Sequence, residues 1–272
     1  TARIAVIDIG SNSVRLAIYG KNGAYPAPLF DERTNCRLGA GLDETGMLSS
    51  DRIVVALETL TRFSAIIRAM KVDSCYPVAT AAVRRAGNGD EFRRPAEIIL
   101  GQAIRVLSQQ EEAAYVARGL TLNVPEASGL VADLGGGSIE IVALKKGEIR
   151  HSVSLNYGHL SNADEAEIIT ALTQIGWIKS FAAKQLFGVG GSFRALGSAF
   201  IEREHYPLPV LHGLKISSDM VMTLCDDFIQ SDSALDGVPV ARRRTMPMAA
   251  KIIRALVDIA AVRRVVVSGT SI

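Results

Sequence analysis

The stretch VADLGGGSIEIVAL, residues 131–144, contains two apolar segments separated by an acid, a leucine, three glycines and a serine. Apolar runs on both sides of a glycine-rich turn predict two strands, residues 130–132 and 139–144, joined as a hairpin. Glycine leaves the backbone uncovered, so successive N–H groups can converge on an anion. The hairpin therefore carries a turn whose composition suits phosphate.

A second stretch near the start of the chain, AVIDIGSNSVRLAIYG at residues 5–20, has the same organisation. Strands are predicted at residues 4–7 and 14–19, the latter from its alternation of apolar residues with Arg15, Ala17 and Tyr19. Alignment of the two stretches superposes the acid, the first glycine and the last serine of each turn: Asp8 with Asp133, Gly10 with Gly135, and Ser13 with Ser138. This repetition favours two diverged copies of one domain, although two unrelated hairpins that merely satisfy turn geometry would look similar.

Strand and helix patterns alternate along the remainder of the chain, which predicts an α/β fold. Further strands are predicted at 74–83 and 104–107, helices from 50 or 51 onward and at 95–100, 110–120, 217–230 and 247–262, and a strand-turn-helix unit at 184–200. Together with the repeat, these patterns predict two tandem domains, residues 1–121 and 122–272.

Length and composition place the chain among ordinary globular proteins. It has 272 residues, 48% of them hydrophobic and 21% charged, with a formal net charge of +2. Three widely spaced cysteines suggest neither a disulfide framework nor a zinc site, so we expect a cytoplasmic protein. No apolar stretch reaches the roughly 18 residues that cross a bilayer, and we expect neither membrane nor nucleic acid as a partner. The chain ends after VVVSGTSI, typical of a strand entering a turn, so we expect it to belong to a longer one.

The acids of the turns predict a metal ion. An acid beside a phosphate is unfavourable unless a cation stands between them, so Asp8, Asp133 and Glu140 predict Mg²⁺ or another divalent cation. A third glycine-rich stretch, GVGGSFRALG at residues 188–197, could present a helix N-terminus to an anion or a nucleoside. Close helix packing around its glycines is an alternative interpretation.

Seven motifs in order resemble the exopolyphosphatase and guanosine pentaphosphate phosphatase family, within the actin-like, heat-shock-chaperone and sugar-kinase ATPase superfamily. They are DIGSNSVRLAIY, CRLGAGLDETGMLS, VATAAVRRAGNGDEF, LSQQEEAAYVARGL, GLVADLGGGSIEIV, SLNYGHL and FGVGGSFRALG, and they cover nearly the whole chain. The resemblance implies two ribonuclease-H-like (actin-like ATPase) domains around an interdomain cleft. It also implies magnesium-dependent hydrolysis of the terminal phosphoanhydride of polyphosphate or guanosine pentaphosphate. The choice between these substrates, and the possibility of a homodimer, stay open.

The resemblance also assigns site residues. It implies that Glu112 is the general base, that Arg84 is a substrate-binding arginine, and that Asp133 and Glu140 hold the metal. The implied phosphate-binding residues, with Arg15 added as part of an electropositive track, are Gly10, Ser11, Asn12, Ser13, Arg15, Gly135, Gly136, Gly137 and Ser138. One departure is Gln109, which stands where the family usually has glycine, so the turn that presents Glu112 could differ.

The remaining arginine, histidine and aromatic residues are interpreted as structural. The run Arg242 to Arg244 is interpreted as a solvated face, and the four histidines as ordinary surface or core residues. Trp177 and Phe181, four residues apart, are interpreted as a packing face.

Two other functions stay open: an ATP-dependent kinase or ATPase of the same superfamily, and a non-catalytic sensor of polyphosphate or of a guanosine alarmone.

Overall fold

The computed structural model describes residues 2–22, 25–181, 185–230 and 235–269. The chain divides into two compact units, residues 1–108 and 109–272. The boundary therefore falls before helix α5 (Gln109–Thr121), whereas the sequence analysis placed it after this helix. The physical reason is that the apolar side of α5 packs against the second sheet, so the whole helix belongs to the second unit.

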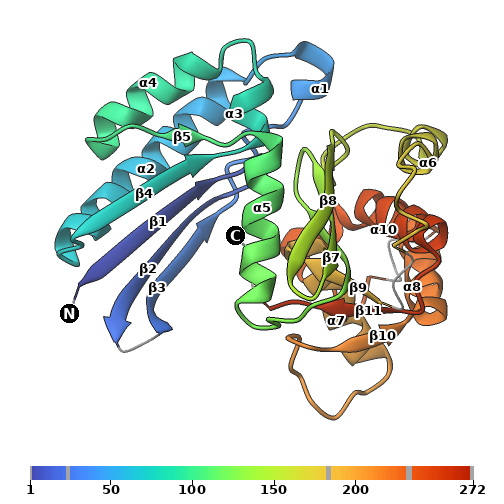
Figure 1. Ribbon diagram of the computed structural model, residues 1–272. Coiled ribbons are helices and arrows are strands. Elements are labelled where there is room, and N and C mark those ends of the chain that lie inside the picture. Colours follow the sequence, from blue (N-terminus) through green and yellow to red (C-terminus); the bar gives the residue numbers. More distant parts are fainter. Residues whose placement is uncertain (1, 23–24, 182–184, 231–234, 270–272) are drawn as a thin grey trace. The chain divides into compact units, whose positions relative to one another are not determined.

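The first unit contains a five-stranded sheet of order β3-β2-β1-β4-β5 (Figure 1). The strands β1 and β2 form the predicted antiparallel hairpin, and β4 runs parallel to β1 on its other side. The third strand of the meander, β3, was not predicted. The bounds are β1 Arg3–Ile9, β2 Val14–Asn22, β3 Tyr25–Thr34, β4 Ser74–Ala79 and β5 Arg105–Val106.

Two helices, α2 (Ser50–Ala69) and α4 (Gly89–Leu100), cover one face of this sheet and share a core with it. Two predictions here were wrong. The strand predicted at 74–83 ends at Ala79, and Ala81–Arg85 is helix α3. The helix predicted to start at Pro95 begins at Gly89, because Phe92 and Ala96 are buried at helical spacing on either side of this proline. The short helix α1 is Leu42–Thr45.

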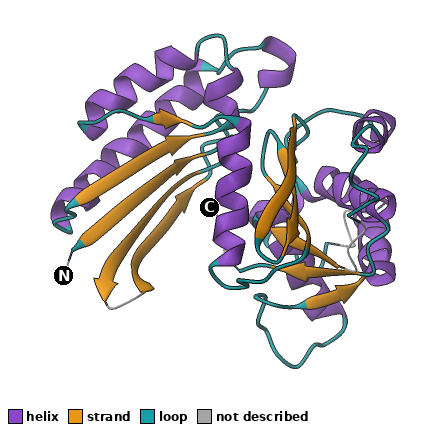
Figure 2. Ribbon diagram, viewed as in Figure 1, coloured by secondary structure: helices purple, strands orange, loops and turns teal. Residues whose placement is uncertain are grey.

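The second unit contains a six-stranded sheet of order β10-β11-β9-β6-β7-β8. Figure 2 draws its strands in orange and the helices in purple. Its strands are β6 Gly129–Leu134, β7 Ile139–Lys145, β8 Glu148–Leu155, β9 Gln185–Val189, β10 Lys215–Ser217 and β11 Arg264–Val267. Its helices besides α5 are α6 Glu165–Thr173, α7 Gly191–Arg203, α8 Ser218–Gln230, α9 Val240–Arg243 and α10 Met246–Ala260. The predicted strand-turn-helix unit corresponds to β9 and α7, apart from Lys184, which lies outside the described residues.

Both faces of β6 and β7 are buried, which explains the continuous apolar runs around the glycine turn. On β6, Leu130, Ala132 and Leu134 belong to the core shared with α7, α8 and α10. Val131 points to the opposite face and packs in a second cluster with α5. The same alternation on β7 places Val142 and Leu144 on the α5 side. Trp177 and Phe181 pack against the larger core, as predicted.

The two sheets repeat one topology. The order β8-β7-β6-β9-β11 of the second unit matches β3-β2-β1-β4-β5 of the first, and β10 is an addition at one edge. Each unit thus starts with a three-stranded antiparallel meander whose first strand has a parallel neighbour. None of the described helices is both long and apolar enough to span a membrane.

Candidate active site

The turns at Gly10 and Gly135 are closed in the same way. The Gly10 N–H donates to the Ser13 carbonyl over 3.0 Å, and the Gly135 N–H donates to the Ser138 carbonyl over 2.9 Å. A Cβ atom added to either glycine would lie 3.3 Å from that same carbonyl oxygen. The repetition seen in the sequence is therefore a repetition of backbone geometry.

Each turn is held by a following loop that contains a glycine. In the first unit, the Gly39 N–H donates to the Ser11 carbonyl over 2.8 Å. In the second unit, the Leu160 N–H donates to the Gly136 carbonyl over 2.9 Å. In a planar trans peptide, the N–H and the C=O point in opposite directions. The Ser11 and Gly136 carbonyls point at the supporting loops, so the N–H groups of the same two peptides point away from these loops. This orientation suits a turn that presents amides to an anion.

Three polar side chains form a row across the second sheet on the α5 side. Asp133 on β6 is the cross-strand partner of Glu140 on β7, which is in turn the partner of Ser154 on β8. The Ser154 hydroxyl donates to Glu140 Oε1 over 2.9 Å. Glu112 belongs to the buried side of α5, together with Ala113 and Val116.

The second unit therefore gathers three carboxyl groups at one place. Glu140 is only 2% exposed and Glu112 only 6%. Burial raises the pKa of Glu140 well above its usual range, and the charges of Glu112 and Asp133 raise it further. Hydrogen bonds from Ser138 and Ser154 act in the opposite direction, because they stabilise the carboxylate. Glu112, Asp133 and Glu140 thus form one electrostatic cluster.

Substitution of Ser154 tests this row. We expect Ser154→Ala to lower the free energy of unfolding by about 1–3 kcal/mol, because the buried Glu140 carboxylate loses a hydrogen-bond donor. Urea denaturation at neutral pH measures the change. Ser152→Ala on the same strand is the matched control, since Ser152 is exposed and should shift stability far less. Equal effects of the two substitutions would contradict the assignment.

The donor set suits a hard divalent cation. Asp133 and Glu140 offer carboxylate oxygens from adjacent strands, which Mg²⁺ prefers as ligands. A Cβ atom at Gly190 would lie 2.5 Å from Asp133 Oδ1, so this carboxylate rests on the bare backbone at the amino end of α7. Within the described ranges, no three His, Cys, Asp or Glu side chains group as a metal site. Magnesium in phosphate sites commonly has only one or two carboxylate ligands, so two acids fit.

The corresponding row of the first unit has a different charge. Asp8 is paired with Arg15, which occupies the position that Glu140 has in the second unit. Arg15 forms an ion pair with Asp31 through two hydrogen bonds. Arg84 lies on α3, which follows the carboxyl end of β4, and its Nη1 donates to the Leu107 carbonyl over 2.8 Å. Because β1 and β4 are parallel neighbours, α3 and the Gly10 turn follow strand ends at the same edge of the sheet.

Two residues beside the second turn were missed by the sequence analysis. His159 is 5% exposed, and its backbone N–H donates to the Gly135 carbonyl over 3.1 Å. Arg242, interpreted from sequence as solvated, is half-buried, and its Nη1 lies 3.4 Å from His159 Nε2. Their positions depend on contacts between distant segments, so no local pattern could reveal them. A histidine directly after the glycine of SLNYGHL was the only signal.

The buried imidazole predicts a pH dependence of stability. Burial, with the charge of Arg242, lowers the pKa of His159 from 6.5 to about 3. Below pH 6.5 the His159 imidazole is protonated in the unfolded chain but stays neutral in the folded chain. The free energy of unfolding therefore falls as the pH falls from 6.5 towards 3. We expect His159 to lower the free energy of unfolding by about 2 kcal/mol between pH 7 and pH 5. Urea denaturation at both pH values should show a smaller loss for His159→Gln than for wild type, and identical losses would contradict the prediction.

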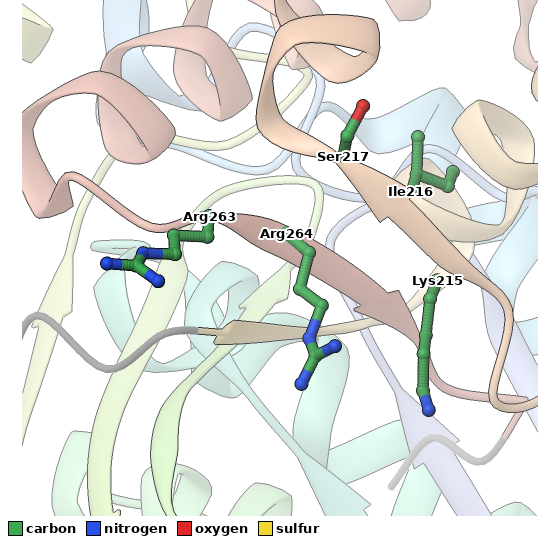
Figure 3. A pocket seen from close by; sticks show the side chains of 5 residues that line it. All are labelled: Lys215, Ile216, Ser217, Arg263 and Arg264. Carbon is green, nitrogen blue, oxygen red and sulfur yellow. The ribbon is translucent and has the colours of Figure 1, made fainter.

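A separate basic pocket of about 360 Å³ is lined by Lys215, Ile216, Ser217, Arg263 and Arg264. Figure 3 shows the Arg264 and Lys215 side chains extending in the same direction from β11 and β10. Arg264 is the first residue of β11, whereas the Gly135 turn follows the carboxyl end of β6. Since β6, β9 and β11 are parallel, the pocket and the turn lie towards opposite ends of the sheet.

Two units with one strand order and one repeated turn define a duplicated α/β protein whose halves each carry a turn of phosphate-binding type. The chain belongs to the Ppx/GppA phosphatase family, whose model matches residues 17–272. It is 28% identical over 280 aligned residues to the guanosine-5'-triphosphate,3'-diphosphate pyrophosphatase of Pseudoalteromonas atlantica. That alignment covers 97% of this chain and 56% of the relative, so the chain spans little more than half of that protein's length.

Solved structures show the same architecture. An exopolyphosphatase from Cytophaga hutchinsonii superposes with a TM-score of 0.88 at 23% identity, covering 99% of this chain and 94% of that one. A Ppx/GppA family member from Aquifex aeolicus superposes with a TM-score of 0.74 at 27% identity, over the same shares. With the repeated strand order, these matches confirm the predicted fold class, α/β with two tandem ribonuclease-H-like domains.

Proposed function

We propose that the chain hydrolyses terminal phosphoanhydride bonds of inorganic polyphosphate, of guanosine pentaphosphate, or of both. Family membership supports phosphatase chemistry, and the names of similar proteins supply the two substrates. The observation that carries the proposal is the electrostatic cluster of the buried Glu112 and Glu140 with the half-buried Asp133, beside a glycine turn. A general base and a cation site next to a phosphate-binding turn are the parts that phosphoryl transfer to water requires.

Glu112 is assigned the proton-transfer role in this proposal. It lies in the first turn of α5, where the positive end of the helix dipole favours the ionised carboxylate. In that state Glu112 accepts a proton from the attacking water while it aligns this water with the phosphorus. Gln109, the departure from the family pattern, is simply the first residue of the helix.

The phosphate groups and their charge are assigned to other residues. The turns Gly10–Ser13 and Gly135–Ser138 are proposed to bind phosphate oxygens through backbone amides, with Arg84 as a guanidinium donor. Asp133 and Glu140 would hold a divalent cation, which when bound neutralises charge on the bridging oxygens. The same cation would offset the repulsion among the three carboxylates that raises the pKa of Glu140.

Phosphate release from the purified protein tests this function. Polyphosphate and guanosine pentaphosphate are supplied separately, each with and without Mg²⁺. Magnesium-dependent release from either substrate without added nucleotide supports the hydrolase. Transfer of phosphate from ATP to an organic acceptor would favour a kinase instead, and tight binding without turnover would favour a sensor. We further propose a cytoplasmic location, because Cys36, Cys75 and Cys225 are free thiols.

A further inference from the structure

The basic pocket at the edge of the second sheet carries an excess of positive charge. Three of its five lining residues are cations, Lys215, Arg263 and Arg264, and none of the five is an acid. All three cations are exposed. Across residues 2–22, 25–181, 185–230 and 235–269, no acidic side chain forms an ion pair with any of them. Three positive charges therefore surround one hollow without a counterion from the described residues.

The register of two strands brings a pair of these cations together. Lys215 on β10 is paired with Val266 on β11, two residues after Arg264. Paired residues of an antiparallel ladder point to the same face, so Lys215 and Arg264 are diagonal neighbours on one face of the sheet. Figure 3 shows their side chains extending in the same direction. Like charges placed in this way repel one another, which an anion between them would relieve.

Protection of the sheet edge is a competing explanation for these charges. β10 is an edge strand, and a lysine on an edge strand discourages pairing with a strand of another chain. This explains Lys215. It does not explain Arg264, because β11 is paired with β10 on one side and with β9 on the other. Nor does it explain the hollow, whose volume of about 360 Å³ lies within the range of small-ligand pockets.

The charge of the pocket identifies a class of ligand. A single phosphate group carries about 1.5 to 2 negative charges at neutral pH, fewer than the three cations, so two or more linked phosphate groups match the pocket better. The guanidinium groups of Arg263 and Arg264 can each bind a pair of phosphate oxygens, and the Lys215 ammonium acts as a point charge. The Ser217 hydroxyl accepts from the Met220 N–H over 3.4 Å and keeps its own hydrogen for a ligand.

The pocket is too far from the Gly135 turn to share a phosphate group with it. Gln185 of β9 is paired with Arg264 of β11. Four residues further along β9, Val189 is paired with Asp133 of β6. Arg264 and Asp133 are therefore separated by two strand spacings across the sheet and four residues along it, which corresponds to roughly 16 Å. An anion in the pocket thus occupies a site of its own.

We propose that this pocket binds an oligophosphate, meaning two or more linked phosphate groups, through Lys215, Arg263 and Arg264. The inference goes beyond the proposed function, because hydrolysis at the glycine turns does not require a second phosphate site. Inorganic polyphosphate and the phosphate end of a nucleotide share this chemistry, and the experiments below distinguish them.

The first experiment measures tripolyphosphate binding to the wild-type protein by calorimetry, at low ionic strength and without Mg²⁺. Without a cation, the carboxylates of the acidic cluster repel an anion at the Gly135 turn, which weakens binding there. The pocket variant, Lys215→Ala combined with Arg264→Ala, should bind tripolyphosphate at least about tenfold more weakly, as expected for loss of charged hydrogen-bond donors.

The matched control combines Lys145→Ala with Lys179→Ala. Both lysines are exposed residues of the second unit outside the pocket, so the control removes the same net charge. Its affinity for tripolyphosphate should stay within about twofold of wild type. Equal affinities of wild type and the pocket variant would overturn the proposal, and so would equal losses in the pocket variant and the control.

Thermal unfolding provides a readout that edge protection would not change. A ligand that binds only the folded chain raises the Tm, so tripolyphosphate should raise the Tm of wild type much more than that of the pocket variant. The pocket variant without ligand should be folded, since the substituted side chains are exposed and their mutual repulsion is removed. An identical rise in Tm for both proteins would mean that the cations only protect the edge.

Two further ligands test the chemical class under the same conditions. Inorganic phosphate should bind at least about tenfold more weakly than tripolyphosphate, because a single group contacts fewer cations. Equal affinities would contradict an oligophosphate site. Guanosine triphosphate presents the same chain with a nucleoside attached. Tighter binding of this nucleotide than of tripolyphosphate, lost in the pocket variant, would identify a nucleotide as the source of the oligophosphate, and otherwise the inorganic chain is the source.

Discussion

The Glu112→Gln variant should lose between about a hundredfold and ten-thousandfold in turnover of the phosphate substrate, with little change in KM. Glutamine has the shape of glutamate but cannot accept a proton from water. The substitution should not destabilise the fold, because it removes a charge that raises the pKa of the buried Glu140. Phosphate release under saturating substrate, together with thermal unfolding, measures both effects.

Glu111→Gln is the matched control for this prediction. It makes the same chemical change one residue earlier on α5, outside the buried side of the helix. Turnover by the control should stay within about twofold of wild type, as expected for a substitution away from the reacting groups. A folded Glu112→Gln enzyme with near-normal phosphate release would remove Glu112 from the catalytic role.

Gly158→Ala should damage the second phosphate turn through the backbone alone. A Cβ atom at Gly158 would lie 2.2 Å from the carbonyl oxygen of Gly136 and 2.5 Å from the nitrogen of Gly137. These atoms belong to main chain rather than to a flexible side chain, so the turn must move. We expect a loss of about 1–3 kcal/mol in the free energy of unfolding from overpacking. Displacement of the turn by about 1 Å should lower turnover about a hundredfold.

The matched control for Gly158→Ala is Gly176→Ala, where an added Cβ would have no atom within 4 Å. Both substitutions add one methyl group to the second unit. Urea denaturation and phosphate release are compared for the two variants. If Gly158→Ala were as stable and as active as the control, the close packing of this loop on the Gly136 peptide would be refuted.

The elements predicted correctly from sequence are those whose local pattern agrees with their burial. The hairpin strands β1 and β2 alternate because one face is buried, and β6 and β7 are continuously apolar because both faces are. The third strands, β3 and β8, were not predicted. They lie at sheet edges or carry many exposed residues, so they lack a clear period. Helix α4 was predicted too short because proline was taken as its start.

Chemistry that depends on adjacent residues was visible in the sequence by itself: the duplicated turn, its acids, the α/β class and the family resemblance. The buried state of Glu112, the row of Asp133, Glu140 and Ser154, and the support of the turns by second loops required the tertiary structure. So did the contact between His159 and Arg242. The physical reason is that a turn is determined by neighbouring dihedral angles, whereas burial and electrostatic coupling arise only when strands and helices distant in sequence pack together.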